Sequence, residues 1–203
     1  MVNASAFLMA YGTSYHALKD RGQVKEGDTV LVLGASGGVG IAAVELAKLM
    51  GAKVIAAAST NDKLKLCKQF GADEVINYST ENLKERTKEL TNGLGVDLIY
   101  DPVGGSYSEQ AFRAIAWKGK HLVVGFANGN IPKIPLNLIL LKGADLVGVF
   151  WGAFTQKEAK KSMQNITELV GWYLMGKLKP HIDATYSLKD APKALEAIMN
   201  RKV

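Results

Sequence analysis

The chain has 203 residues, 48% of them hydrophobic and 22% charged, a composition that fits one large folded domain and excludes collagen-like and intrinsically disordered chains. With a single cysteine, Cys67, the chain cannot form an internal disulfide, so we expect a reducing, cytoplasmic setting. One cysteine and three histidines are also too few soft ligands for a structural zinc site. The net charge of +6 favours anionic partners, which include phosphate-bearing cofactors as well as nucleic acids.

Short β-branched runs alternate with helical stretches along the chain, which predicts a parallel sheet with crossover helices. A helix over residues 4–20 comes first, without the basic flank of a secretory leader. Six strands are predicted at Thr29–Leu33, Val54–Ala58, Glu74–Ile76, Leu98–Tyr100, His121–Val124 and Leu146–Phe150. Further helices are predicted at Val39–Met50, Asp62–Phe70, Glu81–Leu90, Ser108–Ile115, Leu136–Leu141 and Lys157–Leu174. The predicted class is α/β, a doubly wound six-stranded parallel (Rossmann) sheet with helices on both faces.

The strongest motif follows the first strand, where VLVLGASGGVG runs from Val30 to Gly40 into a helical pattern. A strand, a glycine-rich turn and a helix N-terminus form an anion site, because backbone amides and the positive end of the helix dipole face a phosphate. Glycines at 34, 37 and 40 form a variant of the G-x-G-x-x-G dinucleotide fingerprint. A glycine-rich turn with no ligand is the alternative, but the flanking strand and helix favour dinucleotide binding.

The end of the second strand, about 20 residues further on, indicates which dinucleotide is bound, because NAD-selective sites place Asp or Glu there against the ribose 2′-hydroxyl. This chain has Ala58 instead, followed by Ser59, Thr60 and Lys63, which offer hydroxyl groups and a cation to a 2′-phosphate. We interpret the nearby Asp62 as a first-turn helix residue rather than a ribose ligand. The cofactor is therefore predicted to be NADP(H).

The most apolar stretch begins at Ile134 and is interrupted by Asn137, Lys142 and Asp145, which makes it too polar for a membrane span. The sixth predicted strand lies within it and carries the sequence LVGVFWG. An apolar strand at the edge of a sheet invites pairing with a second copy, so we predict a homodimer through this sixth-strand edge.

Several motifs in order resemble the zinc-free quinone oxidoreductases (zeta-crystallin-like) of the medium-chain dehydrogenase/reductase superfamily: GASGGVG with AAVELAKLMGAKVIA, then FGADEVINY, GVDLIYDPVGG and LVVGFANG. The resemblance covers nearly the whole chain. It implies that residues 1–203 are the NADP(H)-binding Rossmann domain of a longer protein. Residues 4–20 and 182–203 would then lead to and from a GroES-like catalytic domain, which nothing in this sequence matches.

The implied activity is that of an NADPH:quinone, or enone/carbonyl, oxidoreductase that transfers hydride from NADPH to a small-molecule acceptor. The substrate pocket of the family lies between the two domains, so we expect the isolated domain to be inactive and name no catalytic residue. The alternative is a non-catalytic NADPH-binding, crystallin-like protein or an RNA-binding protein. Lys and Arg residues are spread over several helices rather than clustered with aromatic residues, so nucleic acid is not the expected partner.

The resemblance also assigns cofactor-binding residues. They are Thr13, Val149 and Phe150 near the nicotinamide; Ser36, Gly37, Gly38 and Val39 at the pyrophosphate; Ser59, Lys63 and Tyr78 at the 2′-phosphate and adenosine; Val103 beside the adenine ribose; and Gly125 and Phe126 after the fifth strand. Three have alternatives: a strand-end cap for Tyr78, a solvated charge for Lys63, and a core or interface aromatic for Phe150. Ser5 stands where zinc-dependent relatives have a cysteine ligand, so no metal is expected.

Overall fold

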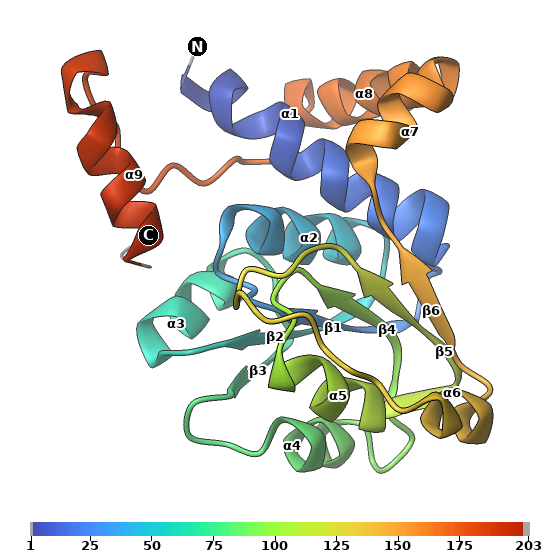
Figure 1. Ribbon diagram of the computed structural model, residues 1–203. Helices are drawn as coiled ribbons and strands as arrows, with labels where there is room; N and C mark the ends of the chain where they lie inside the picture. Colours follow the sequence, from blue (N-terminus) through green and yellow to red (C-terminus); the bar gives the residue numbers. More distant parts are fainter. Residues whose placement is uncertain (1, 201–203) are drawn as a thin grey trace.

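A computed structural model describes residues 2–200 and shows a six-stranded parallel sheet in the order β3-β2-β1-β4-β5-β6. The strands are β1 (Thr29–Leu33), β2 (Lys53–Ala58), β3 (Glu74–Asn77), β4 (Val96–Asp101), β5 (Ile115–Val123) and β6 (Asp145–Gly148). The α-helices are α1 (Val2–Tyr15), α2 (Gly38–Leu49), α3 (Asn61–Gln69), α4 (Leu83–Leu90), α5 (Ser106–Arg113), α6 (Leu136–Lys142), α7 (Trp151–Lys157), α8 (Ala159–Leu174) and α9 (Ala191–Met199). The predicted doubly wound α/β class is confirmed, with helices on both faces of the sheet (Figure 1).

The central strands are buried on both faces, so alternate residues of one strand enter two different hydrophobic cores. Val30 and Val32 of β1 pack in the core that α1 and α2 cover, whereas Leu31 and Leu33 pack in the core that α4 and α5 cover. Cys67 of α3 belongs to the first core, and burial raises the pKa of its thiol to about 11. Apolar burial on both faces fixes the position of the sheet, whose carboxyl-end loops carry the candidate site.

Two predicted boundaries were wrong around the fifth strand. This strand begins at Ile115 rather than His121, and α5 ends at Arg113 rather than Ile115. Trp117 and Lys118 in the first half of β5 are exposed, and the pairing of this strand with β4 shifts register between Val96 and Leu98. Lys118 lies in the same stretch with a positive φ of 62°. An irregular strand of this kind lacks the alternation that identifies a strand in sequence.

The chain between β6 and α9 also differs from the prediction. The sixth strand ends at Gly148 instead of Phe150, and the helix predicted over Lys157–Leu174 is α8, which begins at Ala159 and follows a shorter helix, α7, that the sequence analysis did not predict. Glu158, whose φ of −125° and ψ of 46° are not helical, separates these two helices. The N-terminal helix is α1 followed by a π-helix, η1 (His16–Gly22), rather than one regular helix over residues 4–20.

The segment after α8 crosses the surface of the molecule before it reaches α9. Leu178 is buried in the first core, and the Lys179 amide donates a hydrogen bond to Glu45 Oε1 of α2 at 2.8 Å. A short 3₁₀ turn, η2 (Leu188–Asp190), then leads into α9, which stands apart from the layer of α1 and α2 (Figure 1). Residues 201–203 of the predicted C-terminal segment lie outside the described residues. No helix within residues 2–200 is long and apolar enough to cross a membrane.

Candidate cofactor site

The loop between β1 and α2 is tightly folded by its glycines. Gly34 has a φ of +56°, which favours glycine, and a Cβ at Gly40 would lie 2.3 Å from the Gly34 carbonyl oxygen. Gly40 therefore allows α2 to start directly against the loop. A Cβ at Gly38 would meet nothing within 4 Å, so the backbone there faces open space. This arrangement leaves room for a ligand to approach the main chain closely.

The N-terminus of α2 provides the polar groups of this loop. Gly37 is the N-cap residue and accepts the first helical hydrogen bond, from the Ile41 amide at 2.8 Å. The amides of the first helical turn, Gly38, Val39 and Gly40, have no acceptor within a helix. Together with the positive end of the helix dipole, they are suited to bind a phosphate group.

The second polar group of the site follows β2. Ala58 is buried at the end of the strand, Ser59 is half-buried, and Thr60 caps α3 by accepting a hydrogen bond from the Lys63 amide at 3.4 Å. Asp62 lies in the first turn of α3 and forms an ion pair with Lys65 at 2.8 Å. Asp62 is therefore a first-turn residue, as its place in the sequence indicates.

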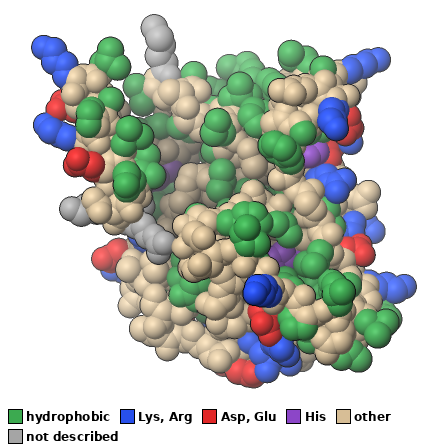
Figure 2. Space-filling model, in the orientation of Figure 1, with side chains coloured by type: hydrophobic (Ala, Val, Ile, Leu, Met, Phe, Trp, Pro, Cys, Tyr) green, Lys and Arg blue, Asp and Glu red, His purple; other side chains and the backbone are tan. Residues whose placement is uncertain are grey.

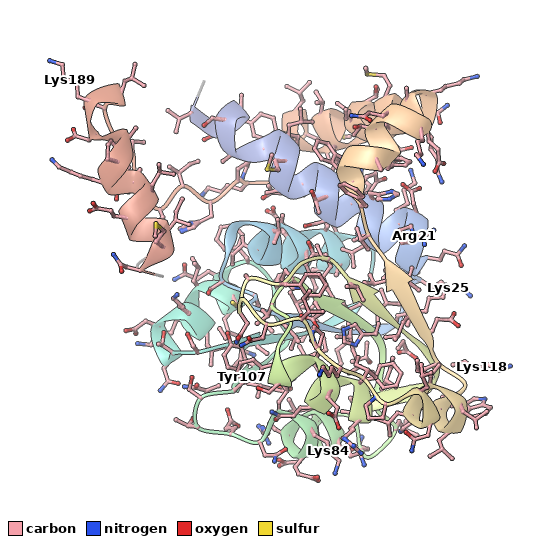
Figure 3. The ribbon with its side chains drawn as sticks, viewed as in Figure 1. Arg21, Lys25, Lys84, Tyr107, Lys118 and Lys189 are labelled. Atoms are coloured by element: carbon pink, nitrogen blue, oxygen red, sulfur yellow. The ribbon has the colours of Figure 1, made fainter. Side chains whose placement is uncertain are left out.

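A cavity of about 540 Å³ brings the glycine loop and the end of β2 together. Six of the predicted residues line it: Ser36, Gly37, Ser59, Lys63, Tyr78 and Val103. Its lining also includes Gly34 of the glycine fingerprint, together with residues that the sequence analysis missed: Ser79, Tyr107, Ala127, Asn128, Ile198 and Met199. Tyr107, in the first turn of α5 (labelled in Figure 3), has its ring centroid 4.4 Å from that of Tyr78. The two rings form a continuous aromatic wall.

The β4–α5 loop, which carries Val103, is held by the buried carboxylate of Asp101. Asp101 Oδ1 accepts hydrogen bonds from the Val103 and Gly104 amides, both at 2.9 Å. Asp101 Oδ2 contacts the Ser108 hydroxyl and lies 3.0 Å from His121 Nε2. Burial opposes ionisation of Asp101, but these contacts outweigh it and lower the pKa of its carboxyl group. The loop is therefore fixed by a charged group beneath it.

The loop after β5 packs against the β4–α5 loop. The Asn128 amide donates to the Val103 carbonyl at 2.8 Å, and the Gly125 amide donates to the Asp101 carbonyl at 3.3 Å. Phe126 is exposed and lies against Gly104, where a Cβ would be 3.0 Å from its ring. Gly125 and Phe126 are thus next to the cavity wall but are not among the residues that line the 540 Å³ cavity.

The remaining predicted residues lie around the C-terminal end of α1. Thr13 follows Gly12, where a Cβ would be only 2.8 Å from the Trp151 ring, so α1 and the start of α7 are in close contact. Val149 is buried, and Phe150 is 76% exposed. Val39 belongs to the same region, because its carbonyl accepts a hydrogen bond from Ser14 Oγ at 2.8 Å. Thr13, Val39, Val149 and Phe150 form a second group outside the lining of the 540 Å³ cavity.

A larger cavity of about 770 Å³ lies on the other side of the glycine loop. Ser36, Gly37 and Lys63 line both cavities, while Gly38, Ser5 and His181 line only the larger of these two. The space-filling view shows the molecule hollowed between α9 and the surface below α1 (Figure 2). Within residues 2–200, no three His, Cys, Asp or Glu side chains gather where they could hold a metal ion.

Comparison with known proteins agrees with this geometry. The sequence profile of the family described as zinc-binding dehydrogenase matches residues 38–168. A quinone oxidoreductase-like protein 2 homolog from Nematostella vectensis is 40% identical over 201 residues, which are 98% of this chain and 55% of that protein. The chain therefore spans little more than half the length of this relative.

Two solved structures share the fold over almost the whole chain. A probable oxidoreductase from Mycobacterium abscessus has a TM-score of 0.89 and 36% identity, covering 100% of this chain and 60% of that one. A mycobacterial protein solved in complex with NADPH has a TM-score of 0.92 and 30% identity, covering 98% of this chain and 62% of that one. The chain belongs to the quinone oxidoreductase family of the medium-chain dehydrogenases/reductases and corresponds to the cofactor-binding domain of that family.

Proposed function

We propose that the chain binds NADP(H) and is the cofactor domain of a zinc-independent, cytoplasmic NADPH:quinone, or enone/carbonyl, oxidoreductase. The observation that carries this proposal is the cavity in which the glycine loop meets Ser59, Lys63 and Tyr78. When bound, NADPH would supply a hydride for an acceptor. The chain's own residues bind and orient the cofactor, and we assign no general acid or base to them.

Separate parts of the site serve separate parts of the cofactor in this proposal. Ser36, Gly37, Gly38 and Val39 hold the pyrophosphate, because the first-turn amides of α2 face open space at Gly38. Val103 lies beside the adenine ribose. Tyr107, which the sequence analysis missed, adds a wall of the adenosine pocket through its contact with Tyr78.

The 2′-phosphate of NADPH would bind at Ser59, Lys63 and Tyr78. A phosphate gains charge-assisted hydrogen bonds from such groups, each worth about 1.5–3 kcal/mol when well formed. Lost hydration and screening reduce the sum, so the chain should bind NADPH about 10–100-fold more tightly than NADH.

Titration calorimetry with both cofactors at one fixed salt concentration tests this preference. Lys63→Ala should weaken NADPH and leave NADH nearly unchanged, whereas Lys65→Ala on the same helix should change neither, because Lys65 does not line the cavity. An acid that repels the 2′-phosphate is better introduced at the half-buried Ser59 than at Ala58, because Ala58 is buried. Ser59→Asp should therefore shift the preference toward NADH. Equal affinity of the unmodified chain for NADPH and NADH would contradict the 2′-phosphate assignment.

The nicotinamide end would lie toward Thr13, Gly125, Phe126, Val149 and Phe150. Thr13, Val149 and Phe150 belong to the second group of residues near α1, and Gly125 and Phe126 lie in the loop after β5. A substrate pocket there requires further walls, which a GroES-like catalytic domain would supply, since the curated relative is almost twice as long as this match. The acceptor would bind in the cleft between the two domains.

The 203-residue chain should therefore bind NADPH without oxidising it at a useful rate. NADPH absorbance followed with a panel of quinones and enones should show no turnover above the protein-free rate. The same segment joined to a family catalytic domain should be active. Rapid NADPH oxidation by the chain alone would place catalytic groups within it and refute the proposed division of labour.

A further inference from the structure

The N-terminal helical segment contacts the end of β6 and the following helix, α7, at three points. Gly12 of α1 lies under the Trp151 ring, where a Cβ would be 2.8 Å away. The His16 ring stacks on the Phe154 ring with centroids 3.8 Å apart and planes 16° apart. Arg21 Nε donates a hydrogen bond to the Gly148 carbonyl at 3.0 Å, and Figure 3 shows Arg21 beside β6. These contacts fix the position of α7 relative to α1.

His16, the central contact, is itself held in one orientation. Its Nδ1 lies 2.8 Å from Asp20 Oδ2, and both side chains are almost completely buried. Asp20 also accepts hydrogen bonds from Asn165 Nδ2 at 2.7 Å and pairs with Lys161 Nζ at 3.1 Å, both from α8. Burial opposes ionisation of Asp20, but these donors outweigh it and lower its pKa. The imidazole is thus fixed between an ionised carboxylate and an aromatic ring.

The local backbone is unusual at this point. His16 and Asp20 lie in the π-helix η1, which continues α1 for seven residues. π-Helical turns are rare and occur frequently at functional sites. Neither His16 nor Asp20 lines the 540 Å³ cavity, so these two residues cannot contact a 2′-phosphate or adenine bound there.

The segment that His16 contacts carries two residues of the predicted nicotinamide group. Phe150 directly precedes Trp151 and is the N-cap residue of α7, and Val149 donates its amide to the Val123 carbonyl at 2.9 Å. Phe150 is highly exposed, so it has few contacts of its own and depends on the placement of α7. Thr13 is the next residue after Gly12, on the other side of the α1–α7 contact.

We propose that His16 is a positioning residue, which acts through Phe154 to hold Phe150 and Val149 at the nicotinamide end of the cofactor. This inference rests on the proposed NADPH site and deepens it. Asp20 keeps the imidazole parallel to Phe154, and Asn165 and Lys161 keep Asp20 in place. Loosening α7 should therefore disturb the nicotinamide end of the site and leave the adenosine end intact.

Two ligands test the proposal with the chain as it exists. Adenosine 2′,5′-bisphosphate probes the adenosine end alone, whereas the fluorescence of bound NADPH reports on the surroundings of its nicotinamide ring. His16→Ala and Phe154→Leu should each weaken NADPH binding by about threefold to tenfold, the range expected for a lost aromatic contact. Both should also reduce the fluorescence enhancement of bound NADPH. The affinity for adenosine 2′,5′-bisphosphate should stay within about twofold of the unmodified value.

Matched variants separate positioning from a general loss of structure. Phe70→Leu removes an aromatic ring that packs on His181, away from α7, and Phe70 lines neither the 540 Å³ nor the 770 Å³ cavity, so this variant should leave the NADPH fluorescence unchanged. His16→Ala combined with Phe154→Leu should be no worse than either change alone, because both break the same contact. If His16→Ala does not fold by circular dichroism, Phe154→Leu provides the same comparison from the other side.

The outcomes are distinct. Unchanged NADPH affinity and fluorescence in a folded Phe154→Leu variant would overturn the proposal. A parallel loss of NADPH and adenosine 2′,5′-bisphosphate binding in both variants would also overturn it, because it would show a global effect. Failure of the unmodified chain to bind either ligand would instead refute the proposed NADPH site.

Discussion

At the residue scale, the candidate site consists of two groups of side chains, one at the 540 Å³ cavity and one near the end of α1. Ser59, Lys63 and Tyr78 meet the glycine loop at one cavity. Ser59 and Lys63 are expected there from the end of the second predicted strand, whereas Tyr78 is expected from the family resemblance. Tyr107 could not be found from the same motifs, because its contact with Tyr78 joins positions 29 residues apart through the tertiary fold. The only available signal was its place just after β4, where ligands of doubly wound sheets bind.

Replacing Tyr107 tests its place in the adenosine pocket. Tyr107→Ala should weaken NADPH and NADH equally, by roughly 5- to 150-fold, because a base stacked on an aromatic ring gains about 1–3 kcal/mol and both cofactors contain adenine. Tyr107→Phe keeps the ring and should retain most of the affinity. Fluorescence titration of both cofactors measures the ratio. A loss confined to NADPH would show that Tyr107 acts through Tyr78 on the 2′-phosphate instead.

At the element scale, the loops after β1, β2 and β4 form the site because the carboxyl ends of parallel strands meet at one edge of the sheet. Strands with continuous apolar runs, such as Val54–Ala58, were predictable from sequence to within one residue. The start of β5 was not, since Lys118 adopts a positive φ and the pairing with β4 changes register. The sequence also gives no sign of the break between α7 and α8 at Glu158, because neither Gly nor Pro occurs at this position.

The contribution of the Asp101 carboxylate to the stability of the β4–α5 loop should depend on pH. The pKa of Asp101 is lowered in the folded chain, so its stabilising contribution is complete above its ordinary value of 3.8 and is lost as the pH falls through the lower folded value. Asp101→Asn should lower the free energy of unfolding by about 3 kcal/mol at pH 7, because it removes the buried carboxylate that accepts hydrogen bonds from the Val103 and Gly104 amides.

Urea unfolding at a series of pH values measures this contribution. The difference between the Asp101→Asn variant and the unmodified chain should narrow below pH 3.8. Asp62→Asn is the control, since the Asp62 side chain is 89% exposed and its loss should leave the unfolding free energy nearly unchanged at every pH. A difference that stays constant down to the acid transition would show that Asp101 is not the titrating group.

At the scale of the whole molecule, exposed apolar side chains indicate surfaces that this chain does not cover by itself. Leu174 and Met175 at the end of α8 are largely exposed, and hydrophobic side chains gather over α1, α7 and α8 in Figure 2. β6 is the last strand of the sheet, so one side of its backbone has no neighbouring strand. We propose that two copies pair antiparallel through β6 about a twofold axis.

Sedimentation equilibrium at tens of micromolar should show a dimer. Val149→Pro is a poor probe, because the Val149 amide donates inward to the Val123 carbonyl. The amide of Leu146 points the opposite way by the alternation along a parallel strand, so Leu146→Pro should remove an edge donor and yield monomers. A monomeric unmodified chain at this concentration would contradict pairing through β6.

The strand order has a consequence for how the chain holds together. β4 joins the sheet beside β1, so the sheet consists of a first half, β1–β3, and a second half, β4–β6, which pair with each other along β1 and β4. Glycine-loop and Lys63 contacts come from one half, and Val103 and Tyr107 come from the other. A dinucleotide bound to both halves would oppose their separation between β1 and β4. Proteolysis through such partial opening should therefore become slower as the fraction of chain with bound cofactor rises.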